Sequence, residues 1–365
     1  MMSYISSIGT AVPKNKILQS QISDFMVRHL ASNEETEKAI RLFYRASGIS
    51  SRHSVIADFG KEITDYSFFP KNSDLEPFPT VSKRMSLYQQ EAVPLALDAI
   101  RNCLSSSQLS EVTHLITVSC TGMYAPGIDI EIIEQLGLKS DIQRTAINFM
   151  GCYAAFNALK VASALIQSNP ASKVLVVAVE LCSIHLLKNT SEDSLLSNAL
   201  FGDGAAAVYL TSQPNGLSLS LKSFYSDVDT DGKQAMAWHI DDFGFSMTLS
   251  SEVPEVIKRG IGSLTKKLLG KLNLSVNEIE HFAIHPGGKR ILQVIEEELG
   301  LSKEQNARAY EVMKRYGNMS SPTVLFVLKS LLDNLSPSDV NTNVLSFAFG
   351  PGLTMESMLL KVHQP

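Results

Sequence analysis

The stretch Val112-Thr-His-Leu-Ile-Thr-Val-Ser119 is rich in apolar and β-branched residues, and Lys173-Val-Leu-Val-Val-Ala-Val-Glu180 has the same character. Both stretches predict buried strands. Between them, residues 153–167 carry Ala, Leu and Val at spacings of three and four and end before Ser168-Asn169-Pro170. This pattern predicts a helix with a proline stop. Strand, helix and strand in this order favour a layered α/β architecture.

The C-terminal part of the chain shows the same alternation. The sequence predicts helices at 251–272, 290–299 and 319–332 and strands at 282–284, 343–349 and 354–360. Residues 60–84 and 223–232 are predicted to be irregular excursions. No periodic repeat or Pro/Gly/Ser-rich linker is present, so we expect two fused halves, residues 1–215 and 216–365, related by topology only.

Composition excludes several classes of protein. The 365 residues are 44% hydrophobic and have a net charge of -5, which makes a large buried core possible and a nucleic-acid partner unexpected. The strongest apolar run, residues 174–179, is far shorter than the roughly 20 residues that a membrane helix needs. The N-terminus does not resemble a signal peptide. Four cysteines without CxxC spacing predict neither disulfides nor a metal site, so we expect a cytoplasmic protein without a membrane partner.

A candidate nucleophile lies between a predicted strand and a predicted helix. Cys152 is part of Met150-Gly-Cys-Tyr-Ala-Ala-Phe156, in which Gly151 permits a tight turn. A helix N-terminus carries about +0.5 charge, which stabilises a thiolate. The alternative interpretation is that a free cysteine is a small buried hydrophobe. We apply that interpretation to the other cysteines, Cys103, Cys120 and Cys182.

Two further residues fit the same chemistry. His285, in Phe282-Ala-Ile-His-Pro-Gly-Gly288, ends a strand at a turn, where functional side chains are common. Asn318, in Tyr316-Gly-Asn-Met-Ser-Ser321, is a turn or cap residue whose amide can also donate to an oxyanion. Acyl transfer through a thioester requires such a set. Cys152 accepts the acyl group, while His285 and Asn318 donate hydrogen bonds to the thioester oxygen.

These motifs resemble the chalcone synthase-like type III polyketide synthases of the thiolase superfamily. In family order, the matching segments are 151–154 (GCYA), 173–177 (KVLVV), 200–206 (LFGDGAA), 285–288 (HPGG), 316–321 (YGNMSS) and 349–354 (FGPGLT). The resemblance implies a five-layer αβαβα fold with two topologically similar halves and a homodimer. It also implies coenzyme A thioesters as substrates and no further cofactor.

The resemblance assigns roles to matching residues. Cys152 loads the starter, while His285 and Asn318 drive decarboxylation of a malonyl thioester and stabilise the enolate. Phe201 matches the aromatic gatekeeper between the coenzyme A tunnel and the cavity, and Ser320 matches a residue of the cavity wall. The family's three phosphate-binding cations are matched by Lys38, Arg41 and Arg45, whose i, i+3, i+7 spacing lies on one helical face.

Several positions depart from the family pattern. Trp238 replaces a small cavity glycine, Met247 replaces a second gatekeeping phenylalanine, and His185 replaces a cavity-wall threonine. Cys120 and Thr121 replace a Thr-Ser pair, and Ala125 replaces a methionine that reaches into the partner subunit. Trp238 and His185 therefore predict a narrow cavity and few extension steps, or an unusual starter.

We expect acyl-CoA loading on Cys152 and decarboxylative Claisen condensation with malonyl-CoA. The product is expected to be a pyrone, a resorcinol-type ring or a diketide. One alternative is a single-condensation 3-ketoacyl synthase that takes its acyl group from coenzyme A or an acyl carrier protein. Another is a non-catalytic binding subunit of the same fold. A papain-like hydrolase also orders Cys, His and Asn in this way, but its cysteine lies near the mature N-terminus in a different motif.

Overall fold

A mixed nine-stranded sheet runs through the computed structural model, which describes residues 2–365, in the order β11-β12-β13-β8-β1-β7-β6-β4-β5. Its strands are β1 (Tyr4–Ala11), β4 (His114–Ser119), β5 (Gln143–Asn148), β6 (Val174–Leu181), β7 (Asp203–Thr211), β8 (Ser218–Val228), β11 (His281–Ile284), β12 (Asn343–Gly350) and β13 (Thr354–His363). Strands β1 and β8 pair only at Tyr4–Ser220 and Ile5–Leu219. Because the two strands share only these two residue pairs, the nine-stranded sheet consists of two smaller sheets, one from each half of the chain, joined at this narrow junction.

The two halves follow the same topology. In the first half, β1, α3 (Val81–Cys103), β4, α6 (Ala154–Ser168), β6 and β7 follow one another, with β5 as an added edge strand. In the second half, the equivalent order is β8, α8 (Val253–Gly270), β11, α11 (Pro322–Leu332), β12 and β13. In both halves one parallel pair is followed by two antiparallel pairs. The predicted duplication of topology is therefore confirmed.

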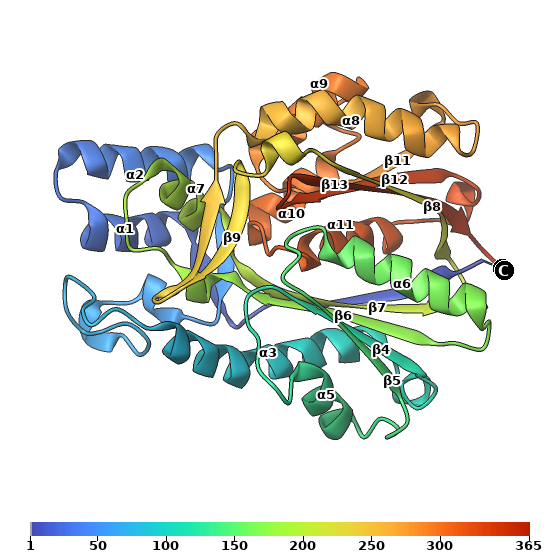
Figure 1. The fold of residues 1–365 in the computed structure, drawn as a ribbon, viewed down its shortest axis with the longest axis horizontal. Helices are drawn as coiled ribbons and strands as arrows, with labels where there is room; N and C mark the ends of the chain where they lie inside the picture. Colours follow the sequence, from blue (N-terminus) through green and yellow to red (C-terminus); the bar gives the residue numbers. More distant parts are fainter. Residues whose placement is uncertain (1) are drawn as a thin grey trace.

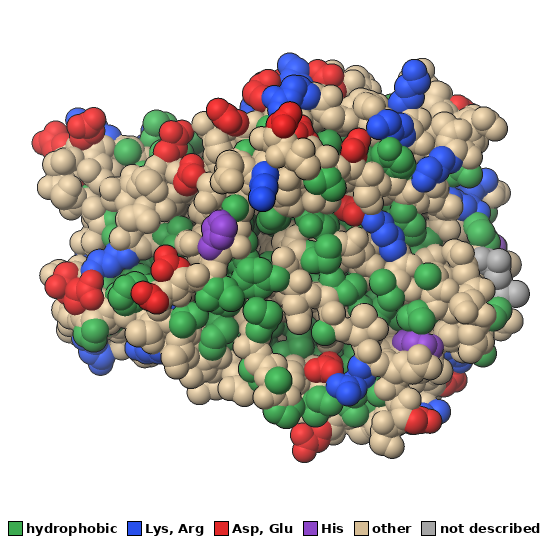
Figure 2. Space-filling view, viewed as in Figure 1, with side chains coloured by type: hydrophobic (Ala, Val, Ile, Leu, Met, Phe, Trp, Pro, Cys, Tyr) green, Lys and Arg blue, Asp and Glu red, His purple; other side chains and the backbone are tan. Residues whose placement is uncertain are grey.

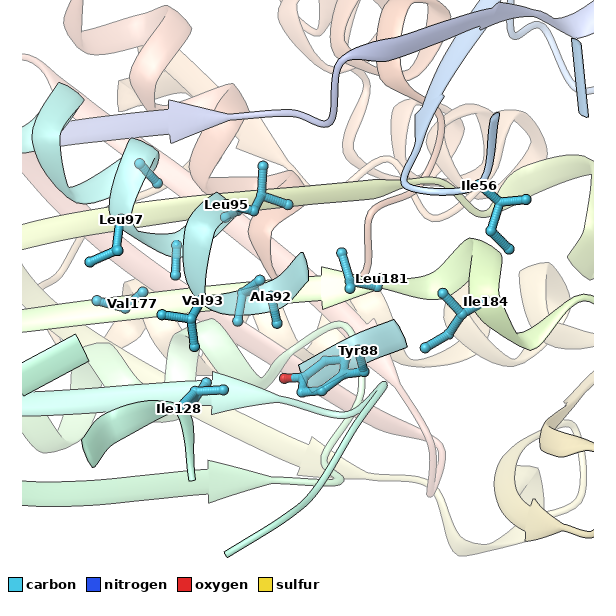
Figure 3. Close-up of a cluster of buried hydrophobic side chains, with 14 of the residues drawn as sticks. Ile56, Tyr88, Ala92, Val93, Leu95, Leu97, Ile128, Val177, Leu181 and Ile184 are labelled. Atoms are coloured by element: carbon cyan, nitrogen blue, oxygen red, sulfur yellow. The ribbon is translucent and has the colours of Figure 1, made fainter. Parts of the chain in front are cut away.

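Five layers result from this duplication (Figure 1). Helices α6 and α11 lie between the two sheets, α3 and α5 (Ile128–Leu136) cover one outer face, and α8 and α9 (Lys289–Leu299) cover the other. Three clusters of buried apolar side chains fill the spaces between layers. Figure 3 shows part of the first cluster, where side chains of α3 meet Val177 and Leu181 of β6 and Ile128 of α5. The αβαβα fold follows from burial of both faces of each sheet.

Smaller elements surround these layers. They are β2 (Asn15–Leu18), β3 (Ser51–Ser54), β9 (Met236–Asp241), β10 (Gly244–Leu249), α1 (Gln19–Leu30), α2 (Glu34–Ala46), α4 (Ser106–Leu109), α7 (Glu192–Leu200) and α10 (Ala307–Tyr316). Short 3-10 turns are η1 (Ala57–Gly60), η2 (Ile63–Asp65), η3 (Cys182–His185), η4 (Thr230–Gly232), η5 (Val276–Glu278) and η6 (Pro337–Asp339). Of the described helices, none combines the length and apolar character needed to cross a membrane.

The predicted strands and helices are confirmed, with small shifts at their ends. The prediction of an irregular segment at 223–232 is wrong, because β8 continues to Val228 and pairs with β13 along its length. The outer half of β8 is only partly buried, which explains its polar composition. Apart from the short turn η2, the excursion at 60–84 is irregular up to Thr80, whose side chain caps α3 by accepting from the Lys83 backbone.

Asp58 organises this excursion, which packs against the first core. Its side chain is fully buried and accepts hydrogen bonds from the backbone N–H groups of Ser67 (2.9 Å), Phe68 (2.8 Å) and Phe69 (2.8 Å). The Phe68 and Phe69 rings stack edge to face at 5.1 Å. The carboxylate therefore fixes the loop that brings both rings into the core.

We expect Asp58→Ala to lower the free energy of unfolding by about 3 kcal/mol, because buried N–H donors lose their acceptor. Urea denaturation followed by circular dichroism measures this effect. Asp98→Ala, at an exposed position, is the matched control and should leave the transition midpoint nearly unchanged. Equal midpoints for the two variants would show that the excursion does not depend on Asp58.

Candidate active site

Cys152 lies in a tight turn between β5 and α6, as the sequence predicts. Gly151 has φ +81°, and a Cβ there would lie 2.6 Å from Pro351 Cδ, so only glycine fits. The Cys152 side chain is buried, and its sulfur faces the side chain of Asn318. The turn therefore places the thiol beside the first turn of α6.

Asn318 is held by hydrogen bonds on both its backbone and its side chain. The Ser320 N–H donates to Asn318 Oδ1 at 2.8 Å, which fixes the orientation of the carboxamide. The Nδ2 group donates to the Gly287 carbonyl at 3.3 Å and lies 3.9 Å from Cys152 Sγ. Asn318 Oδ1 also lies 3.9 Å from Cys152 Sγ, so the carboxamide faces the thiol with both its N–H donor and its oxygen.

His285 follows the last residue of β11 and is fully enclosed. Neither ring nitrogen has a hydrogen-bond partner among the described residues, and the side chain is only 1% exposed. Burial lowers the pKa of His285 to about 3, so the imidazole is neutral at physiological pH. A neutral, unpaired imidazole can donate one hydrogen bond to a substrate oxygen without supplying a strongly acidic proton.

The sequence predicts a thiolate at Cys152, but burial opposes this state. Burial raises the pKa of the Cys152 thiol to about 11. A helix N-terminus contributes about 0.3–1 kcal/mol, which is less than one pKa unit. Desolvation is the larger effect, so burial in the cavity favours the neutral thiol over the thiolate that the helix N-terminus stabilises. The cysteine and the histidine are both neutral there.

One cavity brings the predicted catalytic and wall residues together. Its volume is about 70 Å³, which is small for a ligand cavity. Its lining includes Cys152, His285, Asn318, Phe201, Trp238, Met247, His185, Cys120, Thr121 and Ser320. The structure therefore places these residues in one cavity, although they come from distant parts of the chain.

Trp238 and His185 attach the β9–β10 hairpin to the cavity wall. Trp238 Nε1–H donates to the Cys120 carbonyl at 2.8 Å. The Phe245 N–H donates to His185 Nδ1 at 2.9 Å, so the Nε2–H of this neutral ring donates to the Thr121 carbonyl at 2.6 Å. The His185 and Phe245 rings stack at 4.2 Å, with Trp238 edge-on to both. Both residues thus reduce the space in the cavity while satisfying backbone carbonyls.

Glu180 binds the wall residues Cys120 and Thr121, and no motif in the sequence pointed to it. This fully buried carboxylate accepts from the Cys120 N–H at 3.0 Å, the Thr121 hydroxyl at 2.7 Å and the Ser321 hydroxyl at 3.2 Å. Burial raises its pKa despite these bonds. A single acidic residue at the end of an apolar strand was the signal that could have revealed it.

The three predicted phosphate-binding cations lie on α2, outside the cavity. They share one helix, as the spacing predicts, but Lys38 pairs with Glu34 at 3.5 Å. Arg41 pairs with Glu37 and Asp24, each at 2.8 Å, and Arg45 is exposed. Helix α2 contacts α7, and the Tyr44 hydroxyl donates to the carbonyl of the cavity residue Asn198 at 3.0 Å. The cations are thus next to the cavity, and two of them have acidic partners.

All four cysteines are free thiols, and three of them line the cavity. Burial raises the pKa of Cys103, and it raises the pKa of Cys120 and Cys182 well above the ordinary value. Among residues 2–365, no group of three or more His, Cys, Asp or Glu is arranged to hold a metal ion.

The rate at which iodoacetamide alkylates Cys152 should rise with pH. The thiolate is the reactive form, and a pKa of about 11 means that its fraction grows about tenfold per pH unit over the neutral and mildly alkaline range. Peptide mass spectrometry identifies the site, with Cys152→Ser as the control. A rate already constant near neutral pH would mean that the resting thiol is ionised.

A buried cysteine at a helix N-terminus, a neutral imidazole and an oriented carboxamide thus line one cavity in a thiolase-like fold of two duplicated halves. The chalcone and stilbene synthase family model for the N-terminal domain matches residues 2–214, and the model for the C-terminal domain matches residues 221–363. The chain therefore belongs to the chalcone and stilbene synthase family and is a type III polyketide synthase.

Individual relatives agree with this assignment. The chain is 30% identical to the alpha-pyrone synthesis polyketide synthase-like Pks18 of Mycobacterium tuberculosis, over 99% of this chain and 91% of that protein. The C-terminal type III polyketide synthase domain of Steely1, a hybrid from Dictyostelium, is 28% identical with a TM-score of 0.90, covering 99% of both chains. PKS-I from the brown alga Ectocarpus siliculosus is 28% identical with a TM-score of 0.89, covering 99% of this chain and 98% of that one.

Proposed function

We propose that Cys152 accepts an acyl group from acyl-CoA and that the chain extends it with malonyl-derived units. The Cys152 sulfur attacks the thioester carbonyl, its proton passes to the leaving coenzyme A thiolate, and an acyl-cysteine forms. Malonyl-CoA then loses CO₂, and its enolate carbon attacks the acyl-cysteine and releases the Cys152 thiolate, which is reprotonated. The carrying observation is the Asn318 amide 3.9 Å from Cys152 Sγ beside a histidine with two unpaired ring nitrogens.

The two donors suit the enolate step for a physical reason. Charge develops on the thioester oxygen in a buried cavity, where a fixed hydrogen-bond donor is worth more than in water. With a pKa of about 3, His285 donates as a neutral imidazole and does not protonate the enolate as a strong acid. Asn318 cannot ionise at all. The pair therefore stabilises the anion and leaves its carbon free to attack.

We infer a product made with few extensions: an α-pyrone, a resorcinol-type ring or a diketide. Trp238 and His185 occupy space in a cavity of about 70 Å³, which supports a short product. The name of the mycobacterial relative refers to alpha-pyrone synthesis, which supports the first choice. Incubation with malonyl-CoA and a chain-length series of acyl-CoAs, followed by mass spectrometry, tests this inference. Failure of every acyl-CoA in the series to give an extended product would contradict it.

Trp238→Gly should lengthen or redirect the products. The substitution removes the largest side chain that connects the hairpin to the cavity wall, so more malonyl units can be accommodated. Mass spectrometry of the products measures the number of units. Trp238→Phe keeps most of the bulk but loses the Nε1–H bond and is the matched control. A product profile unchanged in the glycine variant would show that Trp238 does not limit the chain.

The narrow cavity also favours a second candidate, a 3-ketoacyl synthase that performs one condensation with a coenzyme A or acyl-carrier-protein thioester. One malonyl unit per product with every starter would support this activity, and two or more would support the polyketide synthase. A non-catalytic binding subunit predicts no acyl adduct on Cys152 with either type of donor.

For coenzyme A itself we propose the cationic face of α2, formed by Lys38, Arg41 and Arg45. Its support is the shared helix and the contact between α2 and the cavity-lining α7. The phosphates would have to compete with Glu34, Glu37 and Asp24 for two of the cations. We propose no cofactor beyond the thioester substrates.

A homodimer is the assembly that we propose, through the face that carries β5. This edge strand is exposed along most of its length, and Met123, in the loop after β4, is 42% exposed. Figure 2 shows hydrophobic side chains gathered across the lower half of the same view. Unpaired edge strands and apolar patches are features of association surfaces. Light scattering after size exclusion measures the mass of the assembly in solution, which should be twice the mass of one chain.

For the cellular location we propose the cytoplasm. The four free cysteines support a reducing compartment.

A further inference from the structure

Arg52 of β3 is a buried cation with no described carboxylate within ion-pair distance. Its side chain lines the cavity and is 5% exposed, and it forms no ion pair with a described carboxylate. Its Nε donates to Gln19 Oε1 at 3.0 Å, and its Nη1 donates to the carbonyl of Phe201. Burial lowers the pKa of Arg52. The buried Asp203 carboxylate interacts with Arg52 only from beyond ion-pair distance, so neutral oxygens make the direct contacts that hold the guanidinium in place.

The carbonyl that Arg52 contacts belongs to a short ladder connected to the active site. Phe201 forms an isolated parallel bridge with Asn318. The Asn318 N–H donates to the Leu200 carbonyl and the Gly202 N–H donates to the Asn318 carbonyl, each at 2.9 Å. The backbone of Asn318 is thus fixed by the segment that Arg52 holds.

The stem of Arg52 also packs directly on this ladder. A Cβ on Gly317 would lie 2.9 Å from Arg52 Cδ and 2.7 Å from the Leu200 carbonyl oxygen. Gly317 therefore lets the chain before Asn318 approach the arginine and the Leu200 backbone together. Removal of the Arg52 side chain would therefore leave an empty space beside Gly317, the residue that precedes Asn318.

Gln19 gives the arginine a fixed position. While Gln19 Oε1 accepts from Arg52, its Nε2 donates to the Ala199 carbonyl at 2.8 Å and to the Ser47 hydroxyl at 3.1 Å. Arg52 and Gln19 together therefore hold two carbonyls at the end of α7, those of Ala199 and Phe201. Polar groups buried in this way are satisfied in full only when both partners are present.

We propose that Arg52 is a positioning residue for condensation: its guanidinium holds the Phe201 carbonyl and, through the Phe201–Asn318 bridge, sets the position of the Asn318 carboxamide. The proposal rests on the proposed function, in which Asn318 polarises the thioester oxygen. Arg52 touches neither Cys152 nor Asn318 Nδ2 directly. Loss of Arg52 should therefore slow the enolate step, while Cys152 remains able to accept an acyl group.

The test compares Arg52→Met with wild type in three measurements: the final extent of Cys152 acylation, the rate of malonyl-CoA decarboxylation and the melting temperature. We expect acylation to reach the wild-type extent. The kcat for decarboxylation should fall about 10- to 100-fold, because a small misplacement of a catalytic group lowers the rate by about this factor. Arg84→Met is the matched control. Arg84 is also buried and donates to backbone carbonyls, those of Pro79 and Ile184, but it lies outside the ladder, so decarboxylation should stay near wild type.

A second variant, Arg52→Ala, distinguishes positioning from general destabilisation. Millimolar guanidinium should restore part of its decarboxylation rate, because the cation can occupy the vacated site, and urea at equal concentration should not. Arg52→Lys, which keeps the charge without the planar fork, should remain impaired and replaces the methionine variant if that one does not fold. Decarboxylation at the wild-type rate in the arginine variants, or absence of guanidinium rescue, overturns the proposal. If the wild type itself neither acylates Cys152 nor decarboxylates malonyl-CoA, the proposed function fails instead.

Discussion

Replacing Cys152 by alanine should abolish the acyl adduct and lower product formation at least about 1,000-fold, as loss of a catalytic nucleophile does. The remaining cavity thiols, Cys120 and Cys182, are poor substitutes because burial holds their pKa well above the ordinary value. Decarboxylation of malonyl-CoA should persist, since His285 and Asn318 are both retained. Intact-protein mass spectrometry measures the adduct, and CO₂ release measures the second reaction.

Cys103→Ala is the matched control for this experiment. Cys103 is buried on α3 outside the cavity, so its loss should leave acylation of Cys152 intact. Acylation of the Cys152→Ala protein at another residue would assign the nucleophile elsewhere. Loss of malonyl-CoA decarboxylation in that variant would mean that the sulfur takes part in the enolate step.

Asn318→Asp should lower kcat for malonyl-CoA decarboxylation by about 100- to 1,000-fold, the usual effect of removing one oxyanion donor. Aspartate retains an oxygen that can accept from the Ser320 N–H, so the loop keeps its main side-chain anchor. The variant removes the N–H donor directed at Cys152 and places a negative charge near the developing enolate. Both changes disfavour the same transition state.

The control for this substitution is Asn334→Asp, a surface amide that donates to the Ser330 carbonyl. It should show wild-type decarboxylation and a similar melting temperature. Melting of the Asn318 variant separates a folding defect from a catalytic one. A decarboxylation rate close to wild type in a folded Asn318→Asp protein would remove Asn318 from the catalytic set.

Local patterns were sufficient for most of the fold. The β-branched runs before Ser119 and Glu180 predicted β4 and β6, because strands buried on both faces have continuous apolar sequences. The polar composition of residues 223–228 misled the prediction, because the outer part of β8 is only partly buried. A polar composition shows that a segment is exposed, but it does not show whether the segment is a strand. Residues 223–228 form a strand because they pair with β13.

Local patterns also predicted part of the site. Cys152, His285 and Asn318 lie beside glycines at element ends, and this local signal is visible in the sequence. The acidic partners of the α2 cations were also visible, since Glu34 and Glu37 precede Lys38 and Arg41 by four residues. Arg52 had no local signal, because its partners Gln19 and Phe201 are remote and act through backbone carbonyls.

The sequence by itself thus determined the strands β4 and β6, the turn at Cys152 and the family motifs. Hydrophobic periodicity and glycine turns are properties of neighbouring residues, so they are visible without the tertiary structure. The protonation state of Cys152 was decided only by the tertiary structure. Desolvation depends on every element around the sulfur, and it exceeds the effect of the helix N-terminus that the sequence shows. The same holds for Trp238, His185 and Arg52, whose positions depend on backbone groups brought together by folding.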